Sequence, residues 1–142
     1  MIVVYCDGLC EPRNPGGVAT YGFVLYKNSV KIHEGYGVEG EGTGMSNNLA
    51  EYAALCKALE YLRTNNLVDE EIVVRADSRL LIRQMAGEWK VHRGLYLSKH
   101  NEARCIQASF SNIRFEWIPR ERNIEADALS RKAYENYLGT EH

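Results

Sequence analysis

The chain has 142 residues, of which 45% are hydrophobic and 25% are charged, and its formal net charge is −2. This length predicts one domain, residues 1–142, that buries roughly two thirds of the surface of its unfolded chain and needs no disulfide or metal to fold. No run approaches the roughly 18 apolar residues of a membrane span, and no basic stretch precedes the short apolar run at the N-terminus. We therefore expect a soluble, cytoplasmic protein with no membrane partner. The net negative charge argues against nucleic-acid binding by the chain as a whole.

The four cysteines, Cys6, Cys10, Cys56 and Cys105, are scattered and form no C-x-x-C pair. This spacing argues against a zinc site and against the disulfide framework of a small secreted protein. Cys6 and Cys56 lie in apolar runs and are most simply buried thiols. A disulfide stays open as an alternative if the source is a hyperthermophile.

The first part of the chain predicts three strands. Residues 2–7, IVVYCD, form a nearly all-apolar, β-branched run, which is typical of a central strand covered on both faces. A turn rich in proline and glycine follows at 11–17. The runs 18–27 and 30–38 predict an antiparallel hairpin, because only an Asn-Ser pair separates them.

A glycine-spaced loop leads to Ser46 or Asn47 as the N-cap of a helix over 47–62. Apolar residues recur on one stripe of this helix at spacings of three and four residues, and Glu51 heads the stripe that ends at Leu62. An unpaired buried carboxylate is strongly unfavourable. Glu51 is therefore reached by solvent, paired with a cation or bound to a metal.

The second part of the chain predicts two further apolar strands and three helices: strand 71–77, helices 78–87 and 96–110, strand 113–118, and a helix over 124–138 capped by Asn123. The resulting order predicts an α/β fold with a five-stranded mixed sheet, in which three antiparallel strands are followed by parallel additions. Helices should cover both faces of the sheet.

Four acids are predicted to converge at one edge of this sheet. Asp7 and Asp77 each end a buried apolar strand, and parallel strands present their carboxyl ends at the same edge. Glu51 faces the sheet on its helix stripe, and Asp127 lies in the first turn or so of the last helix. Each acid also has a purely structural interpretation: turn chemistry at Asp7, helix capping beside Asp77, and an i,i+4 ion pair of Asp127 with Arg131. Taken together, these structural interpretations become less convincing, because converging carboxylates repel each other unless a cation lies between them.

Hard oxygen ligands of this kind suit Mg²⁺ or Mn²⁺. Two such ions roughly 4 Å apart are the usual device for in-line displacement at a phosphodiester. The acidic constellation therefore points to phosphoryl-transfer chemistry.

The segments YCDGLC, SNNLAEYAAL, RADSRLLI and NIEADALSRKA, in this order, resemble the motifs of type 1 ribonuclease H, the endonuclease that cuts the RNA strand of RNA/DNA hybrids. The resemblance covers nearly the whole chain and implies the ribonuclease H-like fold in a single catalytic domain. It implies that Asp7, Glu51, Asp77 and Asp127 are the catalytic residues and the ligands of two Mg²⁺ or Mn²⁺ ions. In that scheme Asp7 bridges the ions, Asp127 helps to hold the ion that activates water, and Glu51 and Asp77 hold the other. Hydrolysis would leave 3′-hydroxyl and 5′-phosphate ends.

The family also reads the 2′-hydroxyls of the RNA strand through backbone groups and small polar side chains. The resemblance carries these substrate contacts onto Gly8, Cys10, Asn14, Asn47, Asn48 and Arg79. Simple helix capping remains an alternative for the two asparagines at 47 and 48. Grip on the hybrid would come from Trp89, Lys90 and Arg93, with His92 and Lys99 as neighbours in a locally basic segment whose other interpretation is a solvated helical face.

The chain departs from the family pattern in three places. Relatives carry a histidine in the loop before the last acid, whereas this loop reads PRERN. Arg120 or Arg122 would contact phosphate there, but arginine exchanges no proton near neutral pH, so we expect slower or differently limited turnover. Arg79 stands where many relatives have glutamine. The segment 88–97 is too short for a long basic protrusion, and no separate hybrid-binding domain is present, so we expect salt-sensitive binding.

Three functions compete on this sequence. The first is a metal-dependent endonuclease acting on RNA/DNA hybrids, with double-stranded RNA as a further candidate substrate. The second is a non-catalytic hybrid-binding module, which the presence of all four acids disfavours. The third is another nuclease or transferase of the same superfamily, such as an integrase, transposase or junction resolvase, which usually carries additional DNA-binding domains. We expect a monomer.

Overall fold

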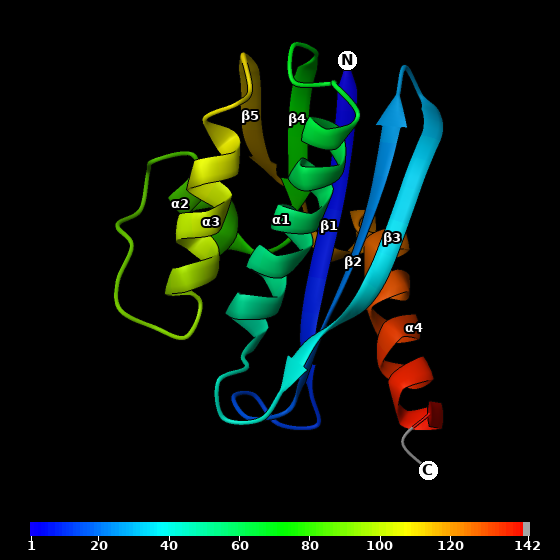
Figure 1. Ribbon diagram of the computed structural model, residues 1–142, viewed down its shortest axis with the longest axis vertical. Helices are drawn as coiled ribbons and strands as arrows, with labels where there is room; N and C mark the ends of the chain where they lie inside the picture. Colours follow the sequence, from blue (N-terminus) through cyan, green and yellow to red (C-terminus); the bar gives the residue numbers. More distant parts are fainter. Residues whose placement is uncertain (141–142) are drawn as a thin grey trace.

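The computed structural model describes residues 1–140, so the last two residues of the predicted domain lie outside the described residues. Five strands form one mixed sheet in the order β3-β2-β1-β4-β5 (Figure 1). Their bounds are β1 Ile2–Glu11, β2 Val18–Lys27, β3 Val30–Glu41, β4 Glu71–Ala76 and β5 Asn112–Trp117. The first three strands pair antiparallel, and β4 and β5 are added parallel to β1. The predicted α/β fold class and mixed sheet are confirmed.

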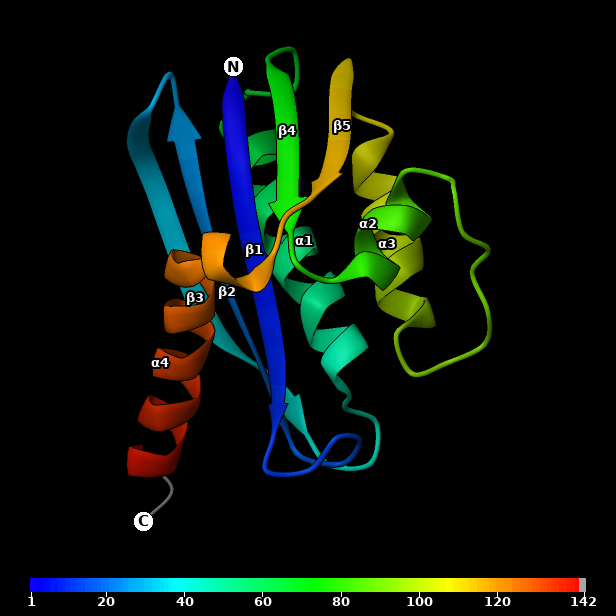
Figure 2. The ribbon, with the colours of Figure 1, turned by 180° about the vertical axis from the view of Figure 1, so that it is seen from behind.

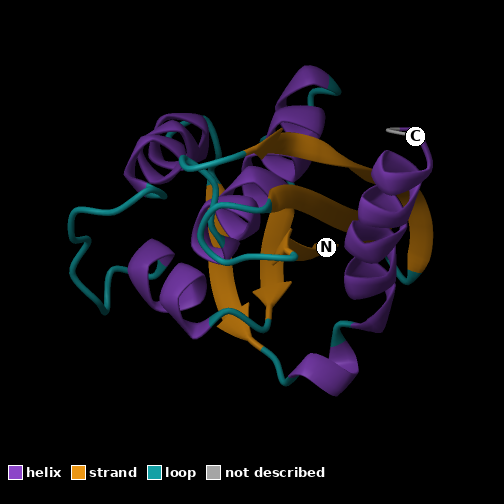
Figure 3. Cartoon of the chain, turned by 90° about the horizontal axis from the view of Figure 1, so that it is seen from below, coloured by secondary structure: helices purple, strands orange, loops and turns teal. Residues whose placement is uncertain are grey.

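Helices cover both faces of this sheet, as expected. Their bounds are α1 Asn47–Thr64, α2 Arg79–Met85, α3 Leu97–Gln107 and α4 Ile124–Thr140, with a short 3₁₀ turn, η1, at Arg120–Arg122. Helix α1 lies in front of the sheet in Figure 1, whereas α4 lies on the opposite face, which Figure 2 views from the front, and contacts β1, β2 and β3. Seen from below in Figure 3, helices flank the strands on either side. No helix among residues 1–140 is long and apolar enough to cross a membrane.

The hydrophobic core lies between the sheet and α1. Side chains that alternate along β1, including Ile2 and Val4, are fully buried against the stripe of α1 that contains Leu55 and Leu62. This stripe is the one that Glu51 heads, so packing of the apolar residues directs the carboxylate towards the sheet. Burying each Leu, Ile or Val contributes about 1.5–3 kcal/mol, which is ample to fix the orientation of the helix.

Strand β1 is longer than its apolar run indicates. It continues to Glu11, because β2 pairs with it over its whole length, whereas the parallel pairing with β4 stops at Tyr5 and Arg75. Asp7 therefore does not end its strand as predicted. It lies just beyond the end of the parallel ladder, where the sheet edge is open.

Strand β5 lies where the sequence predicts a further apolar strand, at 113–118, but it is not covered on both faces. None of its residues is buried, and exposed residues such as Arg114 and Glu116 alternate with half-buried ones. It is the edge strand of the sheet, so only one of its faces packs on the protein.

Candidate active site

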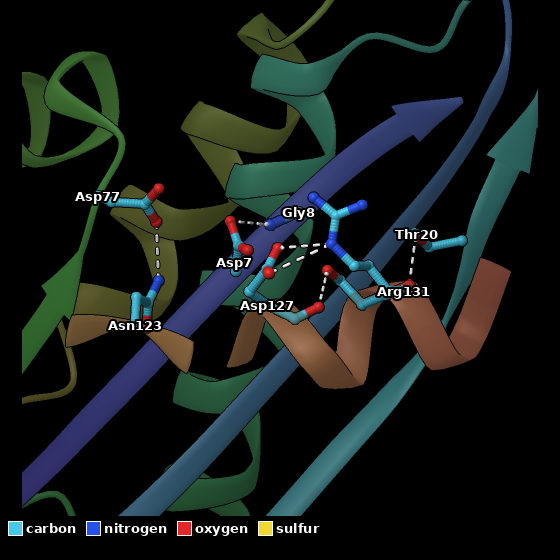
Figure 4. Close-up of polar contacts among 8 residues, drawn as sticks. Asp7, Gly8, Thr20, Asp77, Asn123, Asp127 and Arg131 are labelled. Carbon is cyan, nitrogen blue, oxygen red and sulfur yellow. Dashed lines mark hydrogen bonds and ion pairs between the residues drawn. The ribbon is translucent and has the colours of Figure 1, made fainter. Parts of the chain in front are cut away.

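All four predicted acids line one cavity of about 310 Å³ at the open edge between β1 and β4. Figure 4 shows Asp7 with Asp127 beside it and Asp77 further along the same edge. The complete lining is Asp7, Gly8, Leu9, Glu11, Asn47, Asn48, Glu51, Asp77, Ser78, Arg120, Asp127 and Arg131. The convergence of acids from β1, α1, the end of β4 and α4 was predicted from the sequence, and the structure brings them together.

Two glycines let the helices approach closely enough to place their acids. A Cβ atom on Gly8 would lie 2.3 Å from the backbone carbon of Ala50, next to Glu51 on α1. A Cβ atom on Gly22 would lie 2.5 Å from the carbonyl oxygen of Ala126, next to Asp127 on α4. Real Cβ atoms are not found this close to backbone atoms. Glycine at these two positions therefore sets the distance between the helices and the β1–β2 pair.

Polar contacts also anchor α4. The Thr20 hydroxyl on β2 donates to the Ser130 carbonyl (2.9 Å), and the Ser130 hydroxyl donates to the Asp127 carbonyl (2.8 Å) (Figure 4). Because Thr20 and Ser130 are fully buried, these contacts satisfy hydroxyls that would otherwise destabilise the core. They hold the first turns of α4 against the sheet.

Asp7 and Glu51 form a buried acidic pair. Burial, reinforced by the charges of Asp77 and Asp127, raises the pKa of Asp7 from 3.8 to about 7, although a hydrogen bond with Glu51 acts in the opposite direction. Burial and the neighbouring charge of Asp7 raise the pKa of Glu51 well above its usual range. One oxygen of Glu51, Oε2, is buried and has no hydrogen-bond partner among the described residues. A cation beside this pair would relieve both the repulsion and the missing contact.

Asp77 and Asp127 have protein partners instead. Asn123 donates its Nδ2 to Asp77 Oδ1 at 2.8 Å, and Arg131 donates its Nε to both carboxylate oxygens of Asp127 at 3.2 Å (Figure 4). The ion pair with Arg131 is the structural contact that the i,i+4 spacing predicted. These partners satisfy two acids in the absence of another cation.

The four acids fit a divalent metal by their donor chemistry. Within residues 1–140, no group of three or more acidic, histidine or cysteine side chains is arranged to hold a metal ion as the side chains stand. Asn123 and Arg131 hold Asp77 and Asp127 in their present positions, and each carboxylate keeps lone pairs that could serve a metal. Carboxylate oxygens are the ligands that Mg²⁺ and Mn²⁺ prefer, and Glu51 Oε2 supplies a buried oxygen with no competing contact.

The comparisons with known proteins agree with this geometry. Residues 6–133 match the reverse transcriptase-like family. LC11-RNase H1, solved in complex with an RNA/DNA hybrid, is 37% identical, with a TM-score of 0.87 over 97% of this chain and 99% of that chain. The chain belongs to the type 1 ribonuclease H family. Members of this family generally depend on divalent metals.

Two further relatives come from an archaeon and a bacterium. Ribonuclease HI of Halobacterium salinarum is 32% identical over 93% of this chain and 63% of that protein, and a crystal structure of the halobacterial enzyme has a TM-score of 0.83. The bifunctional protein Rv2228c of Mycobacterium tuberculosis is 34% identical over 93% of this chain. The match covers 35% of that protein, so this chain spans about a third of its length. Its N-terminal RNase H domain has a TM-score of 0.85 and 98% coverage.

The predicted 2′-hydroxyl contacts of this ribonuclease H lie at one end of the acid cavity. Gly8, Asn47 and Asn48 line the cavity, and Cys10 and Asn14 are tied to it by hydrogen bonds. The Cys10 backbone N–H donates to Asn47 Oδ1 (2.7 Å), and the Asn47 backbone N–H donates to Asn14 Oδ1 (2.8 Å). Ser46, not Asn47, caps α1, because its hydroxyl accepts from the Leu49 N–H. The capping alternative for Asn47 is therefore wrong.

The thiols are all free among the described residues, with Cys6, Cys10 and Cys56 buried and Cys105 exposed. The predicted burial of Cys6 and Cys56 is confirmed. The Cys10 thiol donates to the Arg13 carbonyl (3.0 Å), so the thiol and the backbone N–H of Cys10 both have protein partners.

The other predicted contacts lie outside the acid cavity. Trp89, Lys90 and Arg93 are exposed on the loop 86–96, and the Trp89 side chain is 47% exposed. The Arg79 guanidinium stacks on the Trp117 ring, 4.2 Å from its centroid.

The two arginines of the PRERN loop line different cavities. Arg120 lines the acid cavity, whereas Arg122 lines a separate cavity of about 560 Å³ on the α4 side of the sheet. Arg120 is therefore the better candidate for a phosphate contact beside the acids.

Asn123 is the functional residue that the sequence did not reveal. It was predicted to cap α4, and its backbone carbonyl does accept from the Asp127 N–H (3.1 Å). Its buried side chain, however, donates to the Cys6 carbonyl and to Asp77 Oδ1. The side chain joins β1 to the acid at the end of β4, and no local sequence pattern could have predicted a contact between residues this far apart in the chain.

Proposed function

We propose that this ribonuclease H hydrolyses the RNA strand of RNA/DNA hybrids and leaves 5′-phosphate and 3′-hydroxyl ends. The observation that carries the proposal is the cavity with four carboxylates, two of them buried against each other, in a chain of the type 1 ribonuclease H family. Repulsion within the pair of Asp7 and Glu51 makes the cavity a strong site for cations and, without them, a poor site for a phosphodiester.

The acids would hold two Mg²⁺ or Mn²⁺ ions, which supply activation of the attacking water and neutralisation of the charge on the phosphate. Asp7 and Glu51 are held rigidly by β1 and α1 and would orient the site before substrate arrives. Asp77 and Asp127 would turn from Asn123 and Arg131 to complete it. Arg120, at the rim, would contact the phosphate of the RNA strand as a fixed charge.

Selectivity for RNA would come from the group formed by Asn14, Asn47 and Cys10. Its hydrogen bonds fix the backbone at the start of α1 and at β1, next to the acids. Asn48 is exposed beside them and free to pair with a 2′-hydroxyl, the group that distinguishes RNA from DNA. Loop 86–96, with Trp89, Lys90 and Arg93, would contact the DNA strand.

One observation favours the second candidate, a non-catalytic hybrid-binding module. As the side chains stand, Asp77 and Asp127 are engaged by protein partners and no three acids hold a metal site within residues 1–140. A binding module would need the groove and the 2′-hydroxyl contacts but not the rearrangement of these acids.

The test is a cleavage assay with a hybrid labelled on its RNA strand, alongside DNA duplex and double-stranded RNA, in Mg²⁺ and in Mn²⁺. We expect the hybrid to be cut, the DNA duplex to be spared, and Asp77→Asn to remove activity while hybrid binding persists. Cleavage of double-stranded RNA would widen the substrate class. A hybrid that is bound but remains intact with both metals would establish the binding module and overturn the proposal. Expression as a cytoplasmic monomer stays a prediction.

A further inference from the structure

A second buried polar group lies away from the acids, between α1, α2 and α3. Its four members, Tyr52, Gln84, Tyr96 and His100, are each at most 8% exposed, and Gln84 and Tyr52 are fully buried. We call these residues the Gln84 cluster. A buried glutamine is less favourable than an apolar side chain of similar size unless its amide is fully hydrogen-bonded.

The amide of Gln84 uses both of its ends. Nε2 donates to the Lys90 carbonyl (3.2 Å) and to the Tyr96 hydroxyl (3.0 Å), while Oε1 accepts from the Tyr52 hydroxyl (2.7 Å). Only an N–H can pair with the Lys90 carbonyl, so this contact sets the orientation of the amide.

The cluster continues on both sides of the glutamine. Tyr52 gives its only hydroxyl proton to Gln84, so the His100 Nδ1 that lies 3.0 Å from the Tyr52 oxygen is the protonated nitrogen of a neutral imidazole. On the other side, the Tyr96 hydroxyl accepts from the His92 backbone N–H (3.3 Å). The cluster is thus a connected network of hydrogen bonds in which Gln84 Nε2 and the His92 N–H both donate to the Tyr96 hydroxyl.

This network of hydrogen bonds ends on the loop 86–96. The start of the loop is held by the Arg83 carbonyl, which accepts from the N–H groups of Glu88 and Trp89. For the backbone of residues 90–93, the hydrogen bonds to the rest of the described chain are those to Gln84 and Tyr96. Val91 also packs against the core, but the backbone of this stretch depends on the cluster for its hydrogen bonds.

The loop carries exposed groups that suit a nucleic-acid backbone. Trp89, Lys90 and Arg93 are exposed, and the aromatic and basic side chains lie next to the two backbone positions that the cluster holds. An ordered loop loses less conformational entropy on binding than a mobile one.

We propose that Gln84 is a positioning residue that pre-orders the loop 86–96 for the DNA strand of the hybrid, with Tyr52, Tyr96 and His100 completing its hydrogen bonds. The proposal rests on the proposed function for its ligand. It assigns to a buried residue, remote from the acids, a share of the affinity for substrate.

The test compares Gln84→Met, which keeps the volume and removes the amide, with Leu81→Val, a matched substitution of a buried residue on the same helix whose apolar side chain makes no hydrogen bond to the loop. We expect Gln84→Met to raise the KM for hybrid about tenfold with kcat changed by less than about threefold, as for a loss of pre-organisation. Leu81→Val should leave KM unchanged. Amide exchange at His92 should accelerate in Gln84→Met alone.

A double-mutant cycle separates positioning from general destabilisation. In a Trp89→Ala/Arg93→Ala background the loop has lost its contacts, so Gln84→Met should then raise KM little further. An equal rise in both backgrounds, an unchanged KM, or a similar rise in Leu81→Val would each overturn the proposal.

The dissociation constant for hybrid, measured in Mg²⁺ by fluorescence anisotropy with Asp77→Asn added to each variant, gives the same comparison without catalysis. If the protein binds hybrid but never cuts it, the proposed function fails, and the positioning role is still tested by the affinities and by the exchange at His92. If Gln84→Met binds as tightly as the unchanged chain, the positioning role fails whatever the catalytic result.

Discussion

The four acids of the cavity form two unlike pairs. Asp7 on β1 and Glu51 on α1 are buried and repel each other, and Oε2 of Glu51 has no hydrogen-bond partner among the described residues. Asp77 and Asp127 are half-buried, lie at element ends, and are held by Asn123 and Arg131. The first pair carries a buried repulsion between carboxylates, whereas the second pair has hydrogen-bond and ion-pair partners. We infer that the packing of α1 on β1 fixes the positions of Asp7 and Glu51 before a cation binds. Asp77 and Asp127 would change their contacts when a cation binds.

The largest expected effect comes from removing a charge of the pair of Asp7 and Glu51. Asp7→Asn keeps the shape of the side chain but removes a carboxylate that no other residue replaces. We expect hybrid cleavage to fall by at least about 100-fold in Mg²⁺ or Mn²⁺, since charge stabilisation in the transition state is lost. Circular dichroism should show an unchanged fold. Activity within a few fold of the unchanged chain would show that Asp7 has no catalytic role.

The second-largest expected effect comes from Gly8, the residue at which β1 approaches the backbone of α1. Gly8→Ala places a Cβ atom 2.3 Å from the Ala50 backbone, so we expect a loss of about 3 kcal/mol or more in the free energy of unfolding, measured with urea. Gly44→Ala is the matched control, because no atom lies within 4 Å of its Cβ position, and it should change stability by less than about 0.5 kcal/mol. Equal stabilities for the two variants would mean that α1 shifts freely and does not fix Glu51.

The pH dependence of the metal-free protein follows from the raised pKa of Asp7. Below about pH 4 its carboxyl is protonated in both the folded and the unfolded chain. Between about pH 4 and pH 7 the unfolded chain ionises while the folded one keeps its proton, so stability falls as the pH rises. Urea unfolding in EDTA should show this fall. Asp7→Asn should flatten it, and an unchanged slope in this variant would contradict the assignment of the raised pKa.

The smallest expected effect comes from the pair of Asp77 and Asp127, whose carboxylates have protein partners. Arg131→Ala removes an exposed ion pair with Asp127, so we expect a loss of at most about 1 kcal/mol in EDTA. Because Asp127 is then free to turn, Mn²⁺ should stabilise this variant by more than it stabilises the unchanged chain. A smaller stabilisation by Mn²⁺ would show that Arg131 supports the metal site rather than competing for it.

The pair of Asp7 and Glu51 is also the part of the site that the sequence predicts best. The apolar stripe of α1 and the β-branched run of β1 each report burial directly, so Glu51 and Asp7 could be placed from periodicity alone. Strand lengths were less accessible. Pairing with β2 extends β1 to Glu11, and this depends on residues that the apolar run does not contain.

The remaining errors share one cause, which is that tertiary contacts decide side-chain orientation. Asn123 lies where a cap was predicted, yet its amide reaches across to Asp77. Arg122, two residues after Arg120 in a 3₁₀ turn, points to a different cavity. In β5 the alternation of Arg114 and Glu116 with apolar residues is a readable sign of an edge strand.

The most direct test of the account is the free energy of unfolding of Glu51→Gln and the unchanged chain, each measured in EDTA and in Mn²⁺ at a pH above 7. If the buried acids destabilise the metal-free protein and bind a cation, Glu51→Gln has the larger free energy of unfolding in EDTA. Mn²⁺ then raises the free energy of unfolding of the unchanged chain by more than it raises that of the variant. A variant that is less stable in EDTA and gains as much from Mn²⁺ would contradict the account, because Glu51 would then be a structural residue with no part in binding metal.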